Sequence, residues 1–159
     1  MIAPYILIVD DEADVRHMLR RFLATAGYSI LEAETAEDAI RRVEEYSPVV
    51  AFCDVHTPGA NGLWLADQIR SASPTTAVVL ATGDSEVPAN ESLRQGVVAY
   101  LLKPLVQRDV LRALNDGMRW STEATARRLR PRTGLRLTAG AAGDDAAEMN
   151  HCPFVTTYL

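Results

Sequence analysis

Short apolar runs alternate along most of the chain with segments in which apolar residues recur at helical spacing. Five of these runs have the length and composition of buried strands. They are YILIVD (5–10), YSILEA (28–33), VVAFCD (49–54), AVVLAT (77–82) and VVAYLL (97–102). Because each run is almost continuously apolar, we expect strands of a parallel sheet that is covered on both faces.

The segments between and after these runs predict helices. Helical spacing of apolar residues is present over 15–26, 36–43, 62–69 and 110–118, and residues 86–95 form a more weakly patterned helical segment. Thr35 and Asp38 have the spacing of a capping box, Gly27 is a typical helix terminator, and Pro88 fits a first helical turn. Five strand–helix units in this order predict an α/β fold, a doubly wound five-stranded parallel sheet.

Polar residues stand where several of these strands end. Asp10 and Asp11 end the first strand, Asp54 ends the third, Thr82 ends the fourth, and Lys103 follows the fifth. In open α/β sheets, ligands bind beyond the carboxyl ends of the strands. We therefore expect three carboxylates, one hydroxyl and one ammonium group at a single edge of the sheet.

Such a set of groups favours phosphoryl chemistry with a metal ion. Two carboxylates about 4 Å apart near a protein surface repel each other by roughly 4 kcal/mol, so a proton or a cation should lie between them. Mg²⁺ prefers hard oxygen ligands and often serves a phosphate. Phosphoryl transfer requires neutralisation of the moving oxygens, and Asp54 can attack phosphorus to form an acyl phosphate. Taken alone, the Asp10-Asp11 pair also fits a helix cap, and Asp54 also fits a turn residue.

Charge and composition narrow the class of protein. The chain has 15 arginines and one lysine, Lys103. Residues 1–118 carry 10 basic and 17 acidic residues (net −7), and residues 119–159 carry 6 and 4 (net +2). An acidic main domain argues against direct DNA binding. No apolar run of about 18 residues predicts a membrane span, and Cys53 fits core packing in a reducing compartment, so we expect a cytoplasmic protein.

The pattern changes after about residue 120. The segment RWSTEATARRLR (119–130) extends the last helix towards Pro131, and small and polar residues then predict a flexible tail. The chain closes on a short apolar patch, HCPFVTTYL (151–159). We expect one domain over 1–120, followed by a helix extension and tail over 121–159 without a recognisable effector domain.

Four motifs together resemble the receiver domain of two-component response regulators. They are LIVDDE (7–12), CDVHTPGANG (53–62), LATG (80–83) and AYLLKP (99–104), in the order and spacing of the family. The resemblance covers roughly residues 4–120. It implies a flavodoxin-like receiver fold with strand order 2-1-3-4-5 and a phospho-accepting signalling switch rather than an enzyme.

The resemblance also implies residue roles, which we carry over position by position. Asp54 matches the phosphoacceptor, and Asp11 matches a metal-binding acid with Asp10 beside it. The main-chain carbonyl of His56 matches a third Mg²⁺ ligand. Thr82 matches the switch hydroxyl, Tyr100 matches the switch aromatic, Lys103 matches the family lysine, and the Lys103-Pro104 bond matches a peptide bond that is cis in the family. The family often has Met where this chain has Thr57. The His56 side chain either affects how water reaches the acyl phosphate or is an exposed loop residue.

The implied partners are a sensor histidine kinase or phosphotransfer protein upstream and a protein effector downstream. The effector would bind the face formed by the helix at 86–95, the strand at 97–102 and the last helix, and a homodimer through this face is a further option. Two alternatives remain: a receiver fragment of a larger regulator, and a Mg²⁺-dependent phosphatase with an aspartate nucleophile. Such phosphatases typically place a second Asp two residues after the nucleophile, where this chain has His56.

Overall fold

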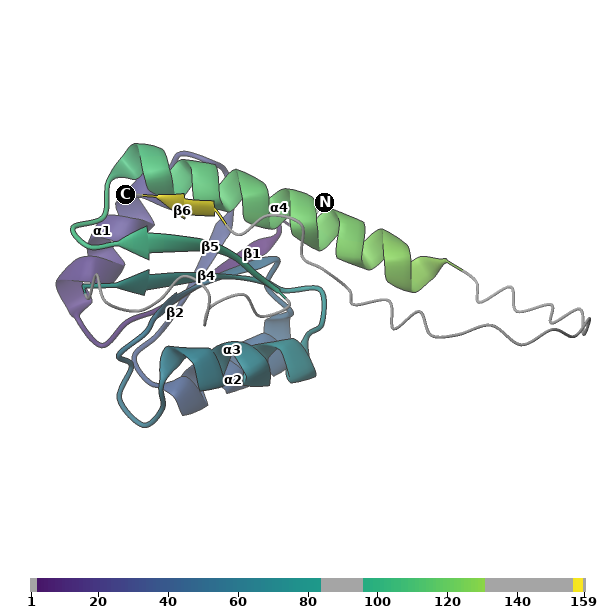
Figure 1. Ribbon diagram of the computed structural model, residues 1–159, viewed down its shortest axis with the longest axis horizontal. Helices are drawn as coiled ribbons and strands as arrows, with labels where there is room; N and C mark the ends of the chain where they lie inside the picture. The colour runs from purple at the N-terminus through teal and green to yellow at the C-terminus, as the bar shows by residue number, and fades with distance from the viewer. Residues whose placement is uncertain (1–2, 84–95, 131–155, 159) are drawn as a thin grey trace, which may run out of the picture.

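A computed structural model of the chain describes residues 3–83, 96–130 and 156–158 (Figure 1). Its strands are β1 (Tyr5–Val9), β2 (Ser29–Ala33), β3 (Val50–Asp54), β4 (Ala77–Thr82), β5 (Val97–Leu102) and β6 (Thr156–Tyr158). Its helices are α1 (Ala13–Ala24), α2 (Ala36–Tyr46), α3 (Gly62–Ala72) and α4 (Gln107–Leu129).

The strands form one sheet in the order β2-β1-β3-β4-β5-β6, and every neighbouring pair is parallel. The order of the first five strands confirms the predicted doubly wound sheet and its 2-1-3-4-5 arrangement. The sequence did not predict β6, which pairs with the outer edge of β5 and places Thr157 in register with Tyr100.

Helices cover both faces of the sheet, with α1 and α4 on one face and α2 and α3 on the other (Figure 1). The side chains of β1 alternate between the two cores. Ile6 and Ile8 pack with the α1 and α4 side, and Leu7 and Val9 pack with the α2 and α3 side. All four are essentially inaccessible to water, which explains why the strands are almost continuously apolar.

Local signals in the sequence explain several helix boundaries. The Thr35 hydroxyl accepts a hydrogen bond from the Asp38 N–H at 3.2 Å, as the capping-box spacing predicts. The side chain of Asn61 caps α3 by accepting from the Leu63 N–H at 2.7 Å. The predicted helix over 86–95 lies outside the described residues.

The last helix continues well past the sheet, as its sequence predicts. It reaches Leu129, two residues before Pro131. The Ser121 hydroxyl donates a 2.6 Å hydrogen bond to the Thr75 carbonyl and so fixes the extension to the loop before β4. Within the part of the chain that the structure describes, none of the helices combines the length and hydrophobicity that a membrane crossing requires.

Candidate functional site

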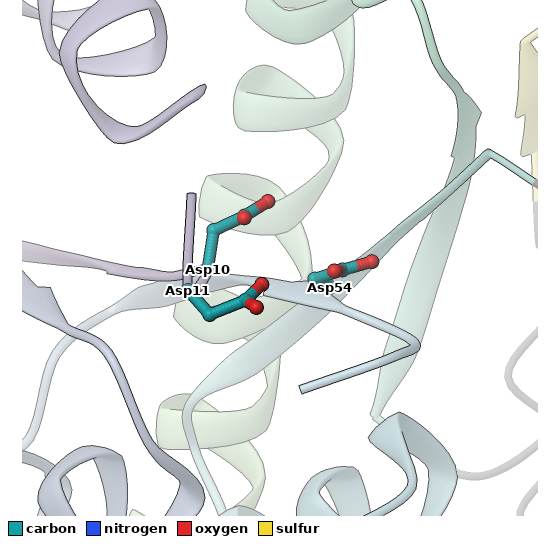
Figure 2. A group of neighbouring side chains, drawn as sticks. All are labelled: Asp10, Asp11 and Asp54. Atoms are coloured by element: carbon teal, nitrogen blue, oxygen red, sulfur yellow. The ribbon is translucent and has the colours of Figure 1, made fainter. Parts of the chain in front are cut away.

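Three carboxylates meet at the carboxyl edge of the sheet. Asp10 and Asp11 directly follow β1, and Asp54 is the last residue of the neighbouring strand β3. One oxygen from each side chain lies within 4.8 Å of the other two (Figure 2). Asp10 and Asp54 are buried and Asp11 is exposed, so the group opens to solvent on the Asp11 side. Carboxylate oxygens in this arrangement are suited to hold a hard divalent cation.

The only lysine of the chain lies against these carboxylates. Its Nζ is 3.0 Å from Asp10 Oδ2, 3.5 Å from Asp54 Oδ2 and 3.6 Å from Glu12 Oε1. Lys103 follows β5, which is separated from β3 by β4, and the flexible stem of lysine spans that distance. The peptide bond from Lys103 to Pro104 is cis, in agreement with the resemblance.

Burial and neighbouring groups of opposite charge shift the pKa of Asp10 in opposite directions, and the same holds for the pKa of Lys103. Burial raises the pKa of the Asp10 carboxyl above its ordinary value, although the Glu12 N–H and the Lys103 ammonium group stabilise its charged form. Burial by itself would lower the pKa of Lys103. The hydrogen bond and charge of Asp10, together with Asp54 and Glu12, outweigh burial and raise the pKa of Lys103 instead. Lys103 is therefore a permanent positive charge beside Asp54 at neutral pH.

Thr82 and Tyr100 lie on β4 and β5, the two strands that follow β3 in the sheet. Thr82 ends β4, is fully buried, and follows Ala81, which pairs in register with Asp54. Its carbonyl accepts a 2.8 Å hydrogen bond from the Lys103 N–H, which ties the ends of β4 and β5 together. Tyr100 lies in β5 and is 2 % exposed. The strand ends therefore place the hydroxyl of Thr82 at the same edge of the sheet as the carboxylates.

The loop after β3 holds Asp54 in place through its backbone. The Thr57 hydroxyl donates to the Asp54 carbonyl at 2.8 Å, and the Gly62 N–H donates to the Val55 carbonyl at 2.8 Å. The backbone approaches so closely here that a Cβ on Gly62 would lie 2.6 Å from the Cα of Val55 and 2.8 Å from the Asp54 carbonyl oxygen. Only glycine fits this position. His56 lies in the same loop and is exposed.

Arg16 is a site residue that the sequence analysis missed. Its guanidinium group donates to the carbonyls of Asp10 (2.8 Å) and Asp11 (3.3 Å) and to the Glu34 carboxylate (2.7 Å). Arg16 is 9 % exposed and lies on the buried stripe of α1 with Leu19. A charged residue on an otherwise apolar helix stripe was the available signal. Arg16 positions the two acids through their backbone rather than through their side chains.

We expect Arg16→Met to destabilise the chain and to weaken divalent-cation binding. Removing the guanidinium group takes this donor from the buried Asp10 carbonyl, which costs about 1–3 kcal/mol. Urea unfolding measures the loss of stability, and calorimetric titration with Mg²⁺ measures the affinity. Arg20→Met is the matched control, because Arg20 forms only an exposed pair with Glu32 and should change stability by no more than about 0.5 kcal/mol. Equal effects of the two substitutions would contradict the positioning role.

Fold and site together define a class of protein: a parallel α/β domain with an acidic cluster and a lysine at the carboxyl edge of its sheet. Comparison with known proteins identifies the family. Residues 6–115 match the family model of the response regulator receiver domain. The chain therefore belongs to the response regulator receiver family, whose members are regulatory phosphoacceptor domains of two-component systems.

Relatives and solved structures agree with this assignment. The chain is 33 % identical over 106 residues to the transcriptional regulatory protein ResD of Bacillus subtilis, covering 67 % of this chain and 44 % of ResD. It is 31 % identical over 113 residues to the protein PilH of Pseudomonas aeruginosa, covering 69 % of this chain and 93 % of PilH. A CheY-like receiver domain from Methanospirillum hungatei has a TM-score of 0.70 and 25 % identity, covering 76 % of this chain and 98 % of that one.

The relatives differ in how much of their length the chain spans. It spans 44 % of ResD and 49 % of the aerobic respiration control protein ArcA of Escherichia coli, but nearly all of PilH. The matches extend over 106 to 116 residues, close to the length of the receiver-domain match at residues 6–115 of this chain. The comparisons therefore establish the family and leave the role of the whole protein to proposal.

Proposed function

We propose that this chain is a phospho-accepting switch of a two-component phosphorelay. Asp54 takes a phosphoryl group from a phosphohistidine of a sensor histidine kinase or phosphotransfer protein. The observation that carries the proposal is the convergence of Asp10, Asp11 and Lys103 on the Asp54 carboxylate. Family membership supports it independently.

The donor set fits Mg²⁺, because it consists of carboxylate oxygens that open to solvent on one side. Asp11, Asp54 and the main-chain carbonyl of His56 would hold the ion, and Asp10 would act mainly through water. Bound Mg²⁺ would supply positive charge to the phosphoryl oxygens. No part of the proposal requires this chain to turn over an external substrate.

The remaining steps belong to the residues of the chain. An Asp54 carboxylate oxygen attacks phosphorus as the bond from phosphorus to the histidine nitrogen breaks, and an acyl phosphate forms. The Lys103 ammonium group, already 3.5 Å from Asp54 Oδ2, pairs with an oxygen of the transferred group. The Thr82 hydroxyl donates to another oxygen from the end of β4.

The output of the switch is a change in the face that contains β5. Movement of Thr82 towards the phosphoryl group makes room for Tyr100 to shift, and β5 and α4 then present a different surface to a protein effector or a second copy. A shift from about 1:99 to 99:1 requires roughly 5.5 kcal/mol. Charge-assisted hydrogen bonds of about 1.5–3 kcal/mol each are of the right size. We place this switch in the cytoplasm and assign it no direct contact with DNA.

Phosphoramidate, a simple donor with a phosphorus–nitrogen bond, tests this function. The chain should take up one base-labile phosphoryl group with Mg²⁺, and Asp54→Asn should take up none. The phosphatase alternative predicts instead repeated hydrolysis of p-nitrophenyl phosphate. His56 argues against that alternative, because it occupies the position where such enzymes place an acid–base aspartate.

The alternative of a receiver fragment from a larger regulator is supported by the partial coverage of ResD and ArcA.

We expect Tyr100→Ala to separate phosphorylation from output. The substitution leaves the carboxylates and Lys103 in place, so Asp54 should still be phosphorylated, but the face around β5 loses its buried ring. Pull-down from the native cell with and without beryllofluoride, which mimics the acyl phosphate, measures the output. Tyr100→Phe is the control and should retain the beryllofluoride-dependent partner. Full partner binding by phosphorylated Tyr100→Ala would refute the assigned role of Tyr100.

A further inference from the structure

The outer edge of β5 has the character of a strand that needs a partner. Residues 97–102 (VVAYLL) contain no charged residue and no proline, and with β6 in place residues 97–101 are at most 2 % exposed. Edge strands that face solvent usually carry charges, prolines or bulges that prevent pairing with other chains. β5 has neither charges nor prolines, and its one register shift against β4 lies near its start, between Val97 and Ala99, so its edge from Ala99 onwards is suited to pairing rather than to exposure.

Residues 156–158 supply that partner within the same chain. They form β6, which lies beside β5 (Figure 1). The two strands are parallel, with Thr156 opposite Ala99 and Tyr158 opposite Leu101. Two threonines and a tyrosine have high β-propensity. The pairing extends the sheet by main-chain hydrogen bonds, which is the geometry of strand addition in peptide recognition.

We propose that the β5 edge is a strand-binding site that residues 156–158 occupy within the chain, and that this occupancy competes with an extended segment of a protein partner. The occupied edge includes Tyr100, which is in register with Thr157. The inference rests on the proposed function only where it assigns this edge to signal output. The strand-binding property itself does not depend on phosphorylation.

The length of the docked segment makes the competition feasible. Three residues provide few main-chain hydrogen bonds, so a separate peptide of this length should bind weakly. The 25 residues from 131 to 155 can span at most about 3.3–3.6 Å each, which exceeds the roughly 34 Å length of α4. A tether that can reach its site gives an effective concentration in the millimolar range. A strand with its own Kd of about 1 mM would then be docked in most molecules and would raise the Kd of a competitor a few-fold.

Paired proline substitutions test the inference. Neighbouring residues of a strand point their N–H groups to opposite sides, so either Thr156 or Thr157 directs its N–H towards β5. Proline has no N–H, and the double substitution Thr156→Pro/Thr157→Pro therefore removes that donor in either case. Thr156→Val/Thr157→Val is the control, because valine keeps the N–H groups and the β-propensity. Hydrogen–deuterium exchange over residues 97–102 measures whether the edge is covered. The synthetic peptide PFVTTYL, residues 153–159 of this chain, is the competing strand.

We expect faster exchange over 97–102 in the proline variant than in the unmodified chain or the valine control. Millimolar peptide should restore protection from exchange in the proline variant. The peptide should bind the proline variant with a Kd a few-fold lower than its Kd for the unmodified chain. Dimers of the proline variant that dissociate when the peptide is added would also support a strand-binding edge. Equal exchange in all three chains, or equal peptide Kd values, would overturn the inference. A chain that ends at residue 154 provides a second test should the proline variant fold poorly.

The same samples separate this inference from the proposed function. Asp54→Asn should show the same exchange over 97–102 and the same peptide Kd as the unmodified chain. A chain that takes up no phosphoryl group but shows the expected competition refutes the phosphorelay function alone. A chain that is phosphorylated but shows no competition refutes the strand-binding edge alone.

Discussion

Lys103→Met should slow phosphorylation by acetyl phosphate about 100-fold and at the same time tighten the binding of Mg²⁺. The Lys103 ammonium group lies 3.0 Å from Asp10 Oδ2 and 3.5 Å from Asp54 Oδ2. Its removal leaves the carboxylates with more uncompensated negative charge, so a divalent cation binds better. The transferred phosphoryl group, however, loses one of the cations that stabilise its oxygens.

The opposite signs of these two effects make the result specific. Mass spectrometry over time gives the phosphorylation rate, and calorimetric titration gives the Mg²⁺ affinity. Lys103→Arg is the control: it keeps the positive charge but replaces a compact ammonium group with a planar fork. We expect it to bind Mg²⁺ nearly as the unmodified chain does while still transferring slowly. A Lys103→Met chain with unchanged phosphorylation, or with weaker Mg²⁺ binding, would contradict the assigned role.

Gly62→Ala should be the most damaging single-methyl substitution near the site. The added Cβ would lie 2.6 Å from the Cα of Val55 and 2.8 Å from the carbonyl oxygen of Asp54, both backbone atoms that cannot rotate away. Overpacking of this kind costs about 1–3 kcal/mol or more. Because Asp54 is part of the displaced backbone, phosphorylation should also decrease.

Urea unfolding measures the loss of stability in Gly62→Ala, and acetyl phosphate labelling measures the loss of function. Gly83→Ala is the matched control. A Cβ at Gly83 meets no atom within 4 Å, so its stability should change by no more than about 0.5 kcal/mol. Equal stabilities of the two variants would show that the loop after β3 relaxes more easily than its geometry indicates.

Periodicity predicted most of the fold because most of the elements are long and strongly patterned. The five apolar runs became β1 to β5 within one residue at each end, and the capping residue Thr35 marked the start of α2. The extension of α4 to Leu129 followed from the absence of a helix breaker before Pro131. β6 could not be predicted, because three residues are too few to show a period and their pairing depends on the distant strand β5.

The sequence predicted those site residues that lie at strand ends, because the ends of parallel strands meet at one edge of the sheet. Side chains at the ends of β1, β3 and β5 were expected at one edge because parallel strands share their carboxyl edge. Asp10, Asp11, Asp54 and Lys103 do meet there. Arg16 escaped prediction because its partners at the two acids are backbone carbonyls, which no side-chain spacing reveals. Roles such as that of Thr82 came from the family resemblance and not from periodicity.

The central claim is that Asp54 accepts a phosphoryl group in a reaction that depends on a divalent cation. The most direct measurement is the intact mass of the chain after incubation with acetyl phosphate and Mg²⁺, followed by mapping of the adduct under conditions that preserve acyl phosphates. We predict one phosphoryl group on Asp54, none when EDTA replaces Mg²⁺, and none in Asp54→Asn. An absent adduct, or an adduct of the same size in Asp54→Asn, would contradict the account.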